Sequence, residues 1–156
     1  MSSSPAPSTH PVPPATARWR VLMCAAMLSA SAGALAAGPD LAQARKLATQ
    51  GNYEAAYELL SPFAATATGD AAFNLPLGEA ALATKRPDQA RSAFERALAA
   101  QPDSVAGHLG LGRAYLALGD YASAKIEFET VLRFEELPPG LEQQVEIYAR
   151  EAEAYA

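Results

Sequence analysis

Cysteine and histidine are scarce in this chain of 156 residues, which contains one cysteine and two histidines. Because Cys24 has no second cysteine to pair with, no disulfide can form within the chain. His108 is the only histidine beyond the first 36 residues, so no histidine pair is present there to hold a metal ion. The glycines at 107, 110 and 112 follow no predicted strand, which excludes a nucleotide-binding loop. The sequence therefore predicts no metal ion and no cofactor, and a structural or surface role for His108.

Residues typical of strands are also few, and no run alternates apolar and polar side chains as a half-buried strand would. Half of the residues are hydrophobic, and alanine dominates that half. Alanine has the highest helix propensity of all residues, and alanine-rich helices can pack closely. The composition therefore predicts an all-α fold.

The first 36 residues do not match the rest of the chain. A proline-rich stretch is followed by Arg18 and Arg20, then by an apolar run over residues 21–35, and Ala34-Leu35-Ala36 has the small–x–small form of a cleavage site. The run has about 15 residues, fewer than the roughly 20 that a membrane-spanning helix needs. We therefore interpret residues 1–36 as a signal peptide with a proline-rich N-terminal extension. A secreted chain without cysteine is expected in the bacterial periplasm, and an uncleaved anchor is the alternative.

Basic residues are the minority, with 12 lysines and arginines against 17 acidic residues. Arg18 and Arg20 lie in the leader and all acidic residues follow it, so the remainder has 10 basic and 17 acidic residues, a net charge of −7. This balance, without a basic stripe, argues against nucleic acid as a partner and against direct binding to anionic lipid. We also predict no direct membrane insertion of the mature chain. The carboxylates fall largely on outward helical positions. We therefore predict that the protein is not an enzyme, with an acidic periplasmic hydrolase as a remote alternative.

One pattern occurs twice between residues 71 and 136, at a spacing of 34 residues. It is carried by small and aromatic side chains, namely Leu77, Gly78, Ala90, Phe94, Ala97 and Pro102, then Leu111, Gly112, Tyr115, Gly119, Ala124, Phe128 and Val131. The pattern resembles the tetratricopeptide repeat, a helix–turn–helix unit. The resemblance implies a right-handed solenoid of about three repeats plus a C-terminal helix. Its units are a degenerate repeat at 37–70, repeats at 71–104 and 105–138, and a capping or incomplete fourth unit at 139–156.

Capping and turn residues place the helices at about 41–50, 53–60, 74–84, 87–100, 104–118, 121–134 and 141–156. Gly51 and Gly119 are expected to end helices in the left-handed conformation, and Asn52 and Asp120 to cap the helices that follow. Asn74 is the predicted N-cap of the third helix. If that helix begins at residue 71 instead, Pro76 must kink it. Lys85 occupies the turn position at which the neighbouring units have glycine, so this turn is expected to close differently.

In tetratricopeptide arrays the first helix of each unit lines a concave groove, and its exposed positions meet the ligand. The resemblance assigns this role to Leu41, Arg45, Leu75, Glu79, Leu82, Leu109, Arg113 and Leu116. Apolar side chains in a groove suit a helix or an extended segment of a protein partner. The alternative is that several of these residues belong to the core. The lysine and asparagine set with which chaperone-binding members clamp a C-terminal carboxylate is not found.

Several segments together resemble the periplasmic helical arm of outer-membrane proteins of the surface-lipoprotein assembly modifier type. These are residues 73–82, 93–98, 112–115 and 127–132, followed by Leu137-Pro138-Pro139 and a further helix. The resemblance implies a non-catalytic, protein-binding arm of an export or assembly factor. It also implies a C-terminal barrel domain, for which no strands occur before Ala156. The last helix is therefore either a cap or the start of a missing part, and a purely structural or oligomerisation piece of a larger protein is the alternative function.

Overall fold

A computed structural model describes residues 38–67 and 69–156 of the chain. The chain divides into two units, residues 1–38 and 39–156, and every element described below belongs to the second unit. The predicted signal peptide lies outside the described residues. Within the described residues all regular structure is helical and no strand occurs, which confirms the predicted all-α fold.

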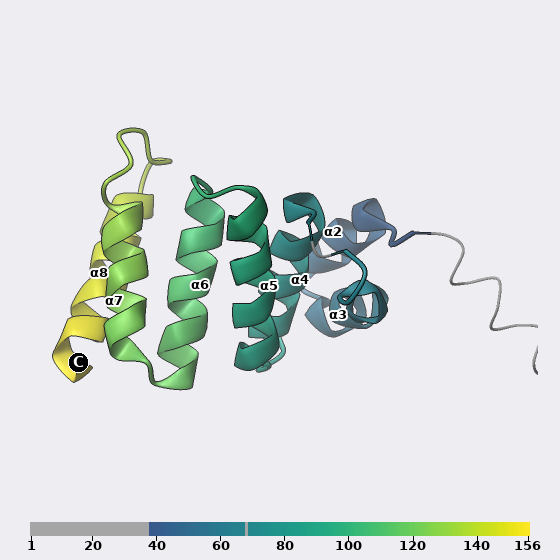
Figure 1. Cartoon of the computed structure of the whole chain (residues 1–156), viewed down its shortest axis with the longest axis horizontal. Coiled ribbons are helices and arrows are strands. Elements are labelled where there is room, and N and C mark those ends of the chain that lie inside the picture. Colours follow the sequence, from purple (N-terminus) through teal and green to yellow (C-terminus); the bar gives the residue numbers. More distant parts are fainter. Residues whose placement is uncertain (1–37, 68) are drawn as a thin grey trace, which may run out of the picture. The chain divides into compact units, whose positions relative to one another are not determined.

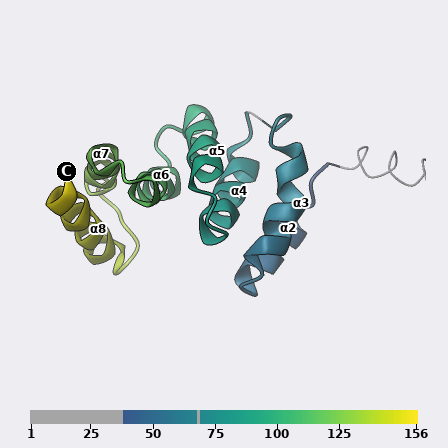
Figure 2. The ribbon, with the colours of Figure 1, turned by 90° about the horizontal axis from the view of Figure 1, so that it is seen from below.

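The described part of the chain contains seven α-helices and one short 3-10 helix, labelled in Figure 1. They are α2 (Leu41–Thr49), α3 (Tyr53–Leu60), η1 (Ser61–Phe63), α4 (Ala71–Ala83), α5 (Pro87–Ala100), α6 (Val105–Leu118), α7 (Tyr121–Val131) and α8 (Leu141–Tyr155). Each α-helix packs against the next in the chain, and α2, α4, α6 and α8 also touch one another in succession. Figure 2 shows the resulting pairs, α2 with α3, α4 with α5 and α6 with α7, followed by α8. The unit at 39–156 is thus a solenoid of helix pairs.

Three of the turns between the two helices of a pair have the same form. Gly51, Lys85 and Gly119 adopt φ angles of 78°, 60° and 77°, in the left-handed region. In the second turn the Arg86 N–H donates to the Ala81 carbonyl at 2.8 Å, and the other two turns have the equivalent bond. The expectation that the turn at Lys85 closes differently is therefore wrong. Its backbone hydrogen bonds offset the cost of about 1 kcal/mol for a side chain in this conformation.

Polar side chains cap most of the helices. Asp40 accepts from the Gln43 N–H at 2.9 Å, and Asn52, Ser104 and Asp120 accept from N–H groups of the first turns of α3, α6 and α7. The predicted caps at Asn52 and Asp120 are confirmed. Each side chain accepts from an N–H only three residues further along the chain, so the sequence signal for the cap is local.

The prediction that Asn74 caps the third helix is wrong. Asp70 caps α4, with its side chain accepting from the Ala72 N–H at 2.8 Å. Asn74 is instead fully buried within the helix. Its amide donates to the carbonyls of Ala67 and Asp70 at 2.7 and 2.8 Å and accepts from Arg96 Nε at 2.9 Å. The amide therefore ties the loop before α4 to α5.

The early start of α4 places Pro76 in the helix interior. A proline has no N–H, so the carbonyl of Ala72, four residues earlier, loses its helical hydrogen bond. Arg45 on α2 approaches this carbonyl, and its Nη2 donates to the Ala72 oxygen at 3.4 Å. A side chain of the preceding pair thus supplies the donor that Pro76 lacks.

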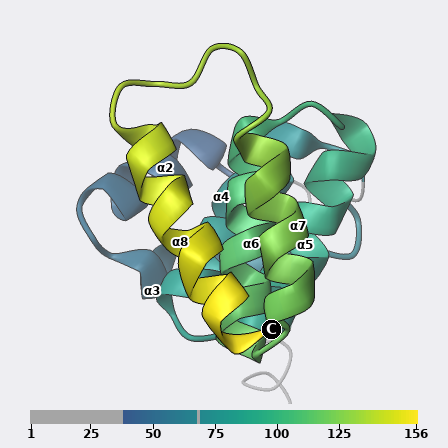
Figure 3. The same cartoon turned by 90° about the vertical axis from the view of Figure 1, so that its left-hand side faces the viewer.

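The C-terminal part departs from prediction at one helix end. α7 ends at Val131 instead of continuing to Phe134. After this point the backbone hydrogen bonds span three residues instead of four: the Arg133 N–H donates to the Thr130 carbonyl, and the Phe134 N–H donates to the Val131 carbonyl. α8 then begins as predicted at Leu141. Figure 3 shows α8 beside α7 at this end of the unit, and α8 also touches α6.

Two fully buried phenylalanines, Phe94 and Phe128, fill the space between the helices. Their rings lie directly over glycines. A Cβ added to Gly78 would lie 2.7 Å from the Phe94 ring, and one added to Gly112 would lie 2.6 Å from the Phe128 ring. These glycines therefore let the rings approach the backbone of α4 and α6, where any side chain would overpack the core.

Candidate functional site

The residues predicted to meet a partner all lie on the first helices of the three pairs. α2 carries Leu41 and Arg45, α4 carries Leu75, Glu79 and Leu82, and α6 carries Leu109, Arg113 and Leu116. Because α2, α4 and α6 touch in succession, these side chains are distributed over one row of neighbouring helices. We call this set of residues the first-helix face.

The first-helix face repeats with the period of the fold. Arg45, Glu79 and Arg113 follow one another at intervals of 34 residues. The structure brings the last two together, with Arg113 Nη1 at 3.2 Å from Glu79 Oε2 and with 38% and 44% of the two side chains exposed. Arg45 forms no ion pair within 38–67 and 69–156, since its guanidinium is turned to the carbonyl of Ala72.

The leucines of the first-helix face are partly buried, and all pack against the core. Leu41 contacts the cluster around Phe73, Leu75 and Leu82 contact the cluster around Phe94, and Leu109 and Leu116 contact the cluster around Phe128. None of them is among the fully buried residues. Each leucine thus supports the core with one part of its side chain and presents another part to solvent.

Sequence reasoning missed one residue in the same register. Ile147 on α8 follows Arg113 by 34 residues, and its side chain is 63% exposed. α8 touches α6, so Ile147 extends the row of first helices by one position. Adding one further period to Arg45, Glu79 and Arg113 would have identified it.

Charge is distributed unevenly between the first and second helices. α2, α4 and α6 carry Arg45, Lys46 and Arg113 against Glu79, a net charge of +2 without His108. The second helices α3, α5 and α7 carry a net charge of −3. Together α2, α4 and α6 are therefore more basic than α3, α5 and α7, whereas α8, with four glutamates and Arg150, carries a net charge of −3.

His108 joins structural elements. Its Nδ1 lies 2.7 Å from Glu127 Oε2 on α7, and its Nε2 lies 2.8 Å from the carbonyl oxygen of Pro102. A neutral imidazole carries one N–H and can donate to only one of these two acceptors. The geometry ties α6 to α7 and to the loop before α6, in agreement with the predicted structural role.

The described residues hold no group of three or more histidine, cysteine and acidic side chains that could bind a metal ion. One tyrosine near Glu127 has a shifted pKa: burial, and then the charges of Glu95 and Glu127, raise the pKa of Tyr115. Within residues 38–67 and 69–156, no helix has both the length and the apolar character needed to cross a membrane.

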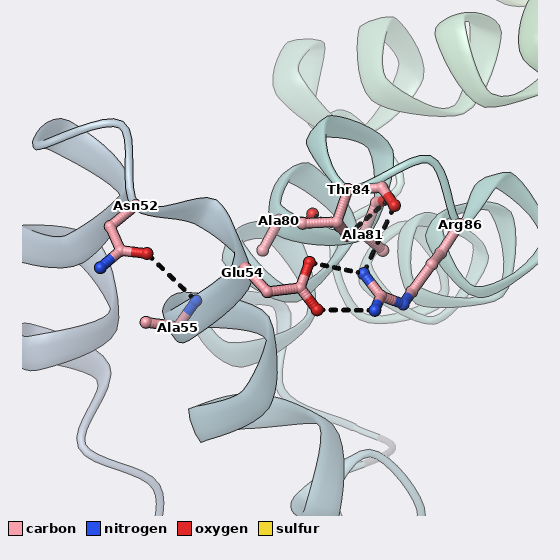
Figure 4. A network of polar contacts seen from close by, with 7 residues as sticks. All are labelled: Asn52, Glu54, Ala55, Ala80, Ala81, Thr84 and Arg86. Carbon is pink, nitrogen blue, oxygen red and sulfur yellow. Dashed lines mark hydrogen bonds and ion pairs between the residues drawn. The ribbon is translucent and has the colours of Figure 1, made fainter.

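The first two helix pairs are joined by a bidentate ion pair, shown in Figure 4. Arg86 donates from Nη2 to Glu54 Oε1 at 2.6 Å and from Nη1 to Glu54 Oε2 at 3.0 Å. The same guanidinium lies 4.4 Å from the centre of the Tyr57 ring. These hydrogen bonds lower the pKa of Glu54. Arg86 therefore connects the start of α5 to α3.

Comparisons with known proteins agree with this architecture. The tetratricopeptide repeat family matches residues 47–106 and 81–136. No curated protein matches the sequence.

Three similar solved structures have TM-scores between 0.62 and 0.64. The first tetratricopeptide domain of human RPAP3 has a TM-score of 0.62 and 19% identity, covering 74% of this chain and 91% of that one. The second such domain of human RPAP3, solved with the HSP70 peptide SGPTIEEVD, has a TM-score of 0.63 and 23% identity, covering 74% and 92%. The Yersinia enterocolitica type III secretion chaperone SycD, solved with a peptide of the translocator YopD, has a TM-score of 0.64 and 17% identity, covering 73% and 89%. Identities this low show a shared fold alone, but the family match extends over more than half of the chain, and the chain belongs to the tetratricopeptide repeat family.

Proposed function

We propose that this protein is a non-catalytic protein-binding module whose first-helix face receives a helical or extended segment of a partner. The observation that carries the proposal is the repetition of leucine and charged positions on three touching first helices, with Arg113 and Glu79 in lateral contact. Two of the similar solved structures contain a peptide, one from HSP70 and one from YopD. The shared fold makes the same mode of binding a reasonable model for this chain.

The charges of α2, α4 and α6 support a proposal for the chemistry of the partner segment. A net charge of +2 on α2, α4 and α6 favours a segment with acidic side chains. Such a side chain would compete with Glu79 for Arg113 and with the Ala72 carbonyl for Arg45. The solvent-facing parts of Leu75, Leu82 and Leu109 favour apolar side chains at neighbouring positions of that segment. The proposed partner is therefore an acidic, amphipathic protein segment.

The proposed location is the bacterial periplasm, either as a free-standing adaptor or as the arm of an outer-membrane export or assembly factor. This part of the proposal is supported by the sequence of residues 1–36 and by the resemblance of residues 73–132 described above. Cell fractionation with N-terminal sequencing tests it. A periplasmic chain that begins near residue 37 is expected, whereas a cytosolic chain that keeps Arg18 and Arg20 would contradict it.

Affinity capture with matched variants tests the binding proposal. Leu109→Glu and Arg113→Glu change the first-helix face, whereas Ile126→Glu changes a side chain on the second helix α7 that is 59% exposed. The same specific partner should be retained by the wild type and by Ile126→Glu and lost by the other two variants. Retention by all three variants would show that the first-helix face is not the binding surface.

A structural or oligomerisation role is the second candidate. α8 exposes Ile147 and Tyr155, with 63% and 68% of their surfaces accessible, as a contact face of another chain would. Light scattering of the purified protein distinguishes the two candidates. A dimer that Ile147→Glu dissociates would favour the structural role, and a monomer would favour the binding role.

A further inference from the structure

A cavity of about 250 Å³ lies outside the first-helix face, between α3 with η1 and the neighbouring second helix α5. Its apolar wall includes Tyr57, Ala64 and Leu77, and its polar wall includes Ser92 and Arg96 on α5. No residue that lines it belongs to the first-helix face. The cavity is therefore independent of the partner surface proposed above.

Pro62 accounts for the unfilled space. α3 ends after eight residues and continues into η1, which contains Pro62, whereas α5 runs for fourteen residues. A proline cannot donate the backbone hydrogen bond that would extend the α-helix. The second half of α5 thus faces a short 3-10 turn and a loop instead of a full helix, and the lining residues Ser61 and Ala64 come from that segment.

A hydrogen bond to Asn74 fixes the position of the Arg96 side chain. Its Nε donates to Asn74 Oδ1 at 2.9 Å, and Asn74 is fully buried with its amide hydrogens given to two backbone carbonyls. Within residues 38–67 and 69–156, Arg96 has no carboxylate in ion-pair range, and this is its one side-chain hydrogen bond. Arg96 is a half-buried residue that lines the cavity, and its two terminal nitrogens remain available to a planar acceptor.

We propose that this cavity binds a carboxylate attached to a short apolar chain. The carboxylate pairs with the terminal nitrogens of Arg96, and the apolar chain lies against Leu77, Ala64 and Tyr57. Asp88 also lines the cavity, but it precedes Arg96 by eight residues, about 12 Å along the helix, so it does not occupy the guanidinium. The volume lies below the roughly 300 Å³ at which pockets for drug-sized ligands begin, so it suits a fragment such as a short fatty acid or the C-terminal residue of a peptide.

Titration followed by two-dimensional amide NMR tests the proposal on the purified protein. Hexanoate and acetyl-leucine represent the free acid and the peptide end, and hexanamide is the neutral match of hexanoate. Saturable shifts are expected at the amides of Ser92 and Arg96 with at least one carboxylate. Binding of hexanamide should be at least about tenfold weaker than that of hexanoate, about 1.4 kcal/mol.

Three variants test the charge of Arg96, the volume of the cavity and the level of nonspecific binding. Arg96→Gln should weaken carboxylate binding at least about tenfold. Ser92→Leu fills the cavity and leaves Arg96 in place, so it should abolish binding without lowering the melting temperature. Arg133→Gln, in which an arginine side chain that is 73% exposed is replaced, should bind as the wild type does.

Each outcome decides the proposal. Binding of either carboxylate with the expected loss in Arg96→Gln supports it, and the tighter ligand identifies the source. Absence of saturable shifts with both carboxylates, equal binding of hexanamide, or unchanged binding in Arg96→Gln or in Ser92→Leu overturns it. No residue that lines the cavity belongs to the first-helix face. The outcome of the titration therefore does not affect the interpretation of the capture experiment with Leu109→Glu.

Discussion

Arg113 and Glu79 lie 34 residues apart in the sequence, and their side chains meet at 3.2 Å between α6 and α4. The sequence separation equals the repeat period, so the two residues occupy the same position in consecutive repeats. Their contact shows that α4 and α6 present this position to the same side. Arg113 is therefore a suitable probe of the first-helix face.

The first prediction concerns the stability of this ion pair. Because 38% of the Arg113 side chain and 44% of the Glu79 side chain are exposed, each of Arg113→Ala and Glu79→Ala should lower the free energy of unfolding by no more than about 1 kcal/mol. Urea denaturation measures this value. A decrease of several kcal/mol in the free energy of unfolding of either variant would show that the ion pair is needed for the fold. Arg113 could then not serve as a probe of binding.

Phe128→Ala should lower the free energy of unfolding by about 3–5 kcal/mol. The ring is fully buried over Gly112 and stacks on Tyr148 with centroids 5.4 Å apart, so its removal leaves a large cavity between α6, α7 and α8. Thermal and chemical denaturation measure the loss. Ile126→Ala on the same helix is the control and should change little. A shift of only a degree or two in the melting temperature of Phe128→Ala would contradict this description of the core.

Lys85→Gly should stabilise the fold by roughly 0.5–1 kcal/mol, because glycine adopts the left-handed conformation without strain. Lys85 has a φ of 60° in a turn that is otherwise the same as those at Gly51 and Gly119. The reverse change, Gly119→Ala, should destabilise the fold by a similar amount. The urea midpoints of Lys85→Gly and Gly119→Ala, each compared with that of the wild type, measure these changes in stability. A decrease in stability on Lys85→Gly would mean that the lysine side chain itself supports the turn.

The pair of Glu54 and Arg86 predicts a pH dependence. The hydrogen bonds from Arg86 lower the pKa of Glu54 below its ordinary value of 4.5. A carboxyl group with a lower pKa in the folded chain stabilises the fold above its unfolded pKa, and this contribution disappears as the pH falls through the folded pKa. Below about pH 4.5 the wild type should therefore lose stability more steeply than Glu54→Gln.

Denaturation at a series of acidic pH values measures this slope. Arg86→Gln removes the donor instead of the acceptor, and its slope should be as shallow as that of Glu54→Gln. Equal slopes for the wild type and Glu54→Gln would show that the ion pair does not persist in solution.

Local signals predicted much of the fold. The bounds of α3 and α5 agree with prediction because Asn52, Pro62 and Pro87 act on the backbone within a few residues of themselves. The start of α4 was predicted wrongly because the role of Asn74 depends on Arg96, which is 22 residues away. A capping residue and a buried polar residue look the same in sequence, and only the tertiary contacts distinguish them.

The resemblance to the tetratricopeptide repeat assigned the residues of the first-helix face, and the structure places them on α2, α4 and α6. The repeat period could have added Ile147. It could not predict that Arg45 turns to the carbonyl of Ala72, because that contact results from Pro76 in the next repeat. It also could not predict the cavity at Arg96, because the cavity exists where the first repeat departs from the pattern.

Site-specific photo-crosslinking tests the central claim most directly. A photo-reactive amino acid is placed at position 113 on α6 in one sample and at position 126 on α7 in another, and both are irradiated in the presence of the cell's own proteins. The account predicts a discrete crosslinked protein from position 113, competed by an excess of the unmodified chain, and none from position 126. The same adduct from position 126, with none from position 113, would contradict it.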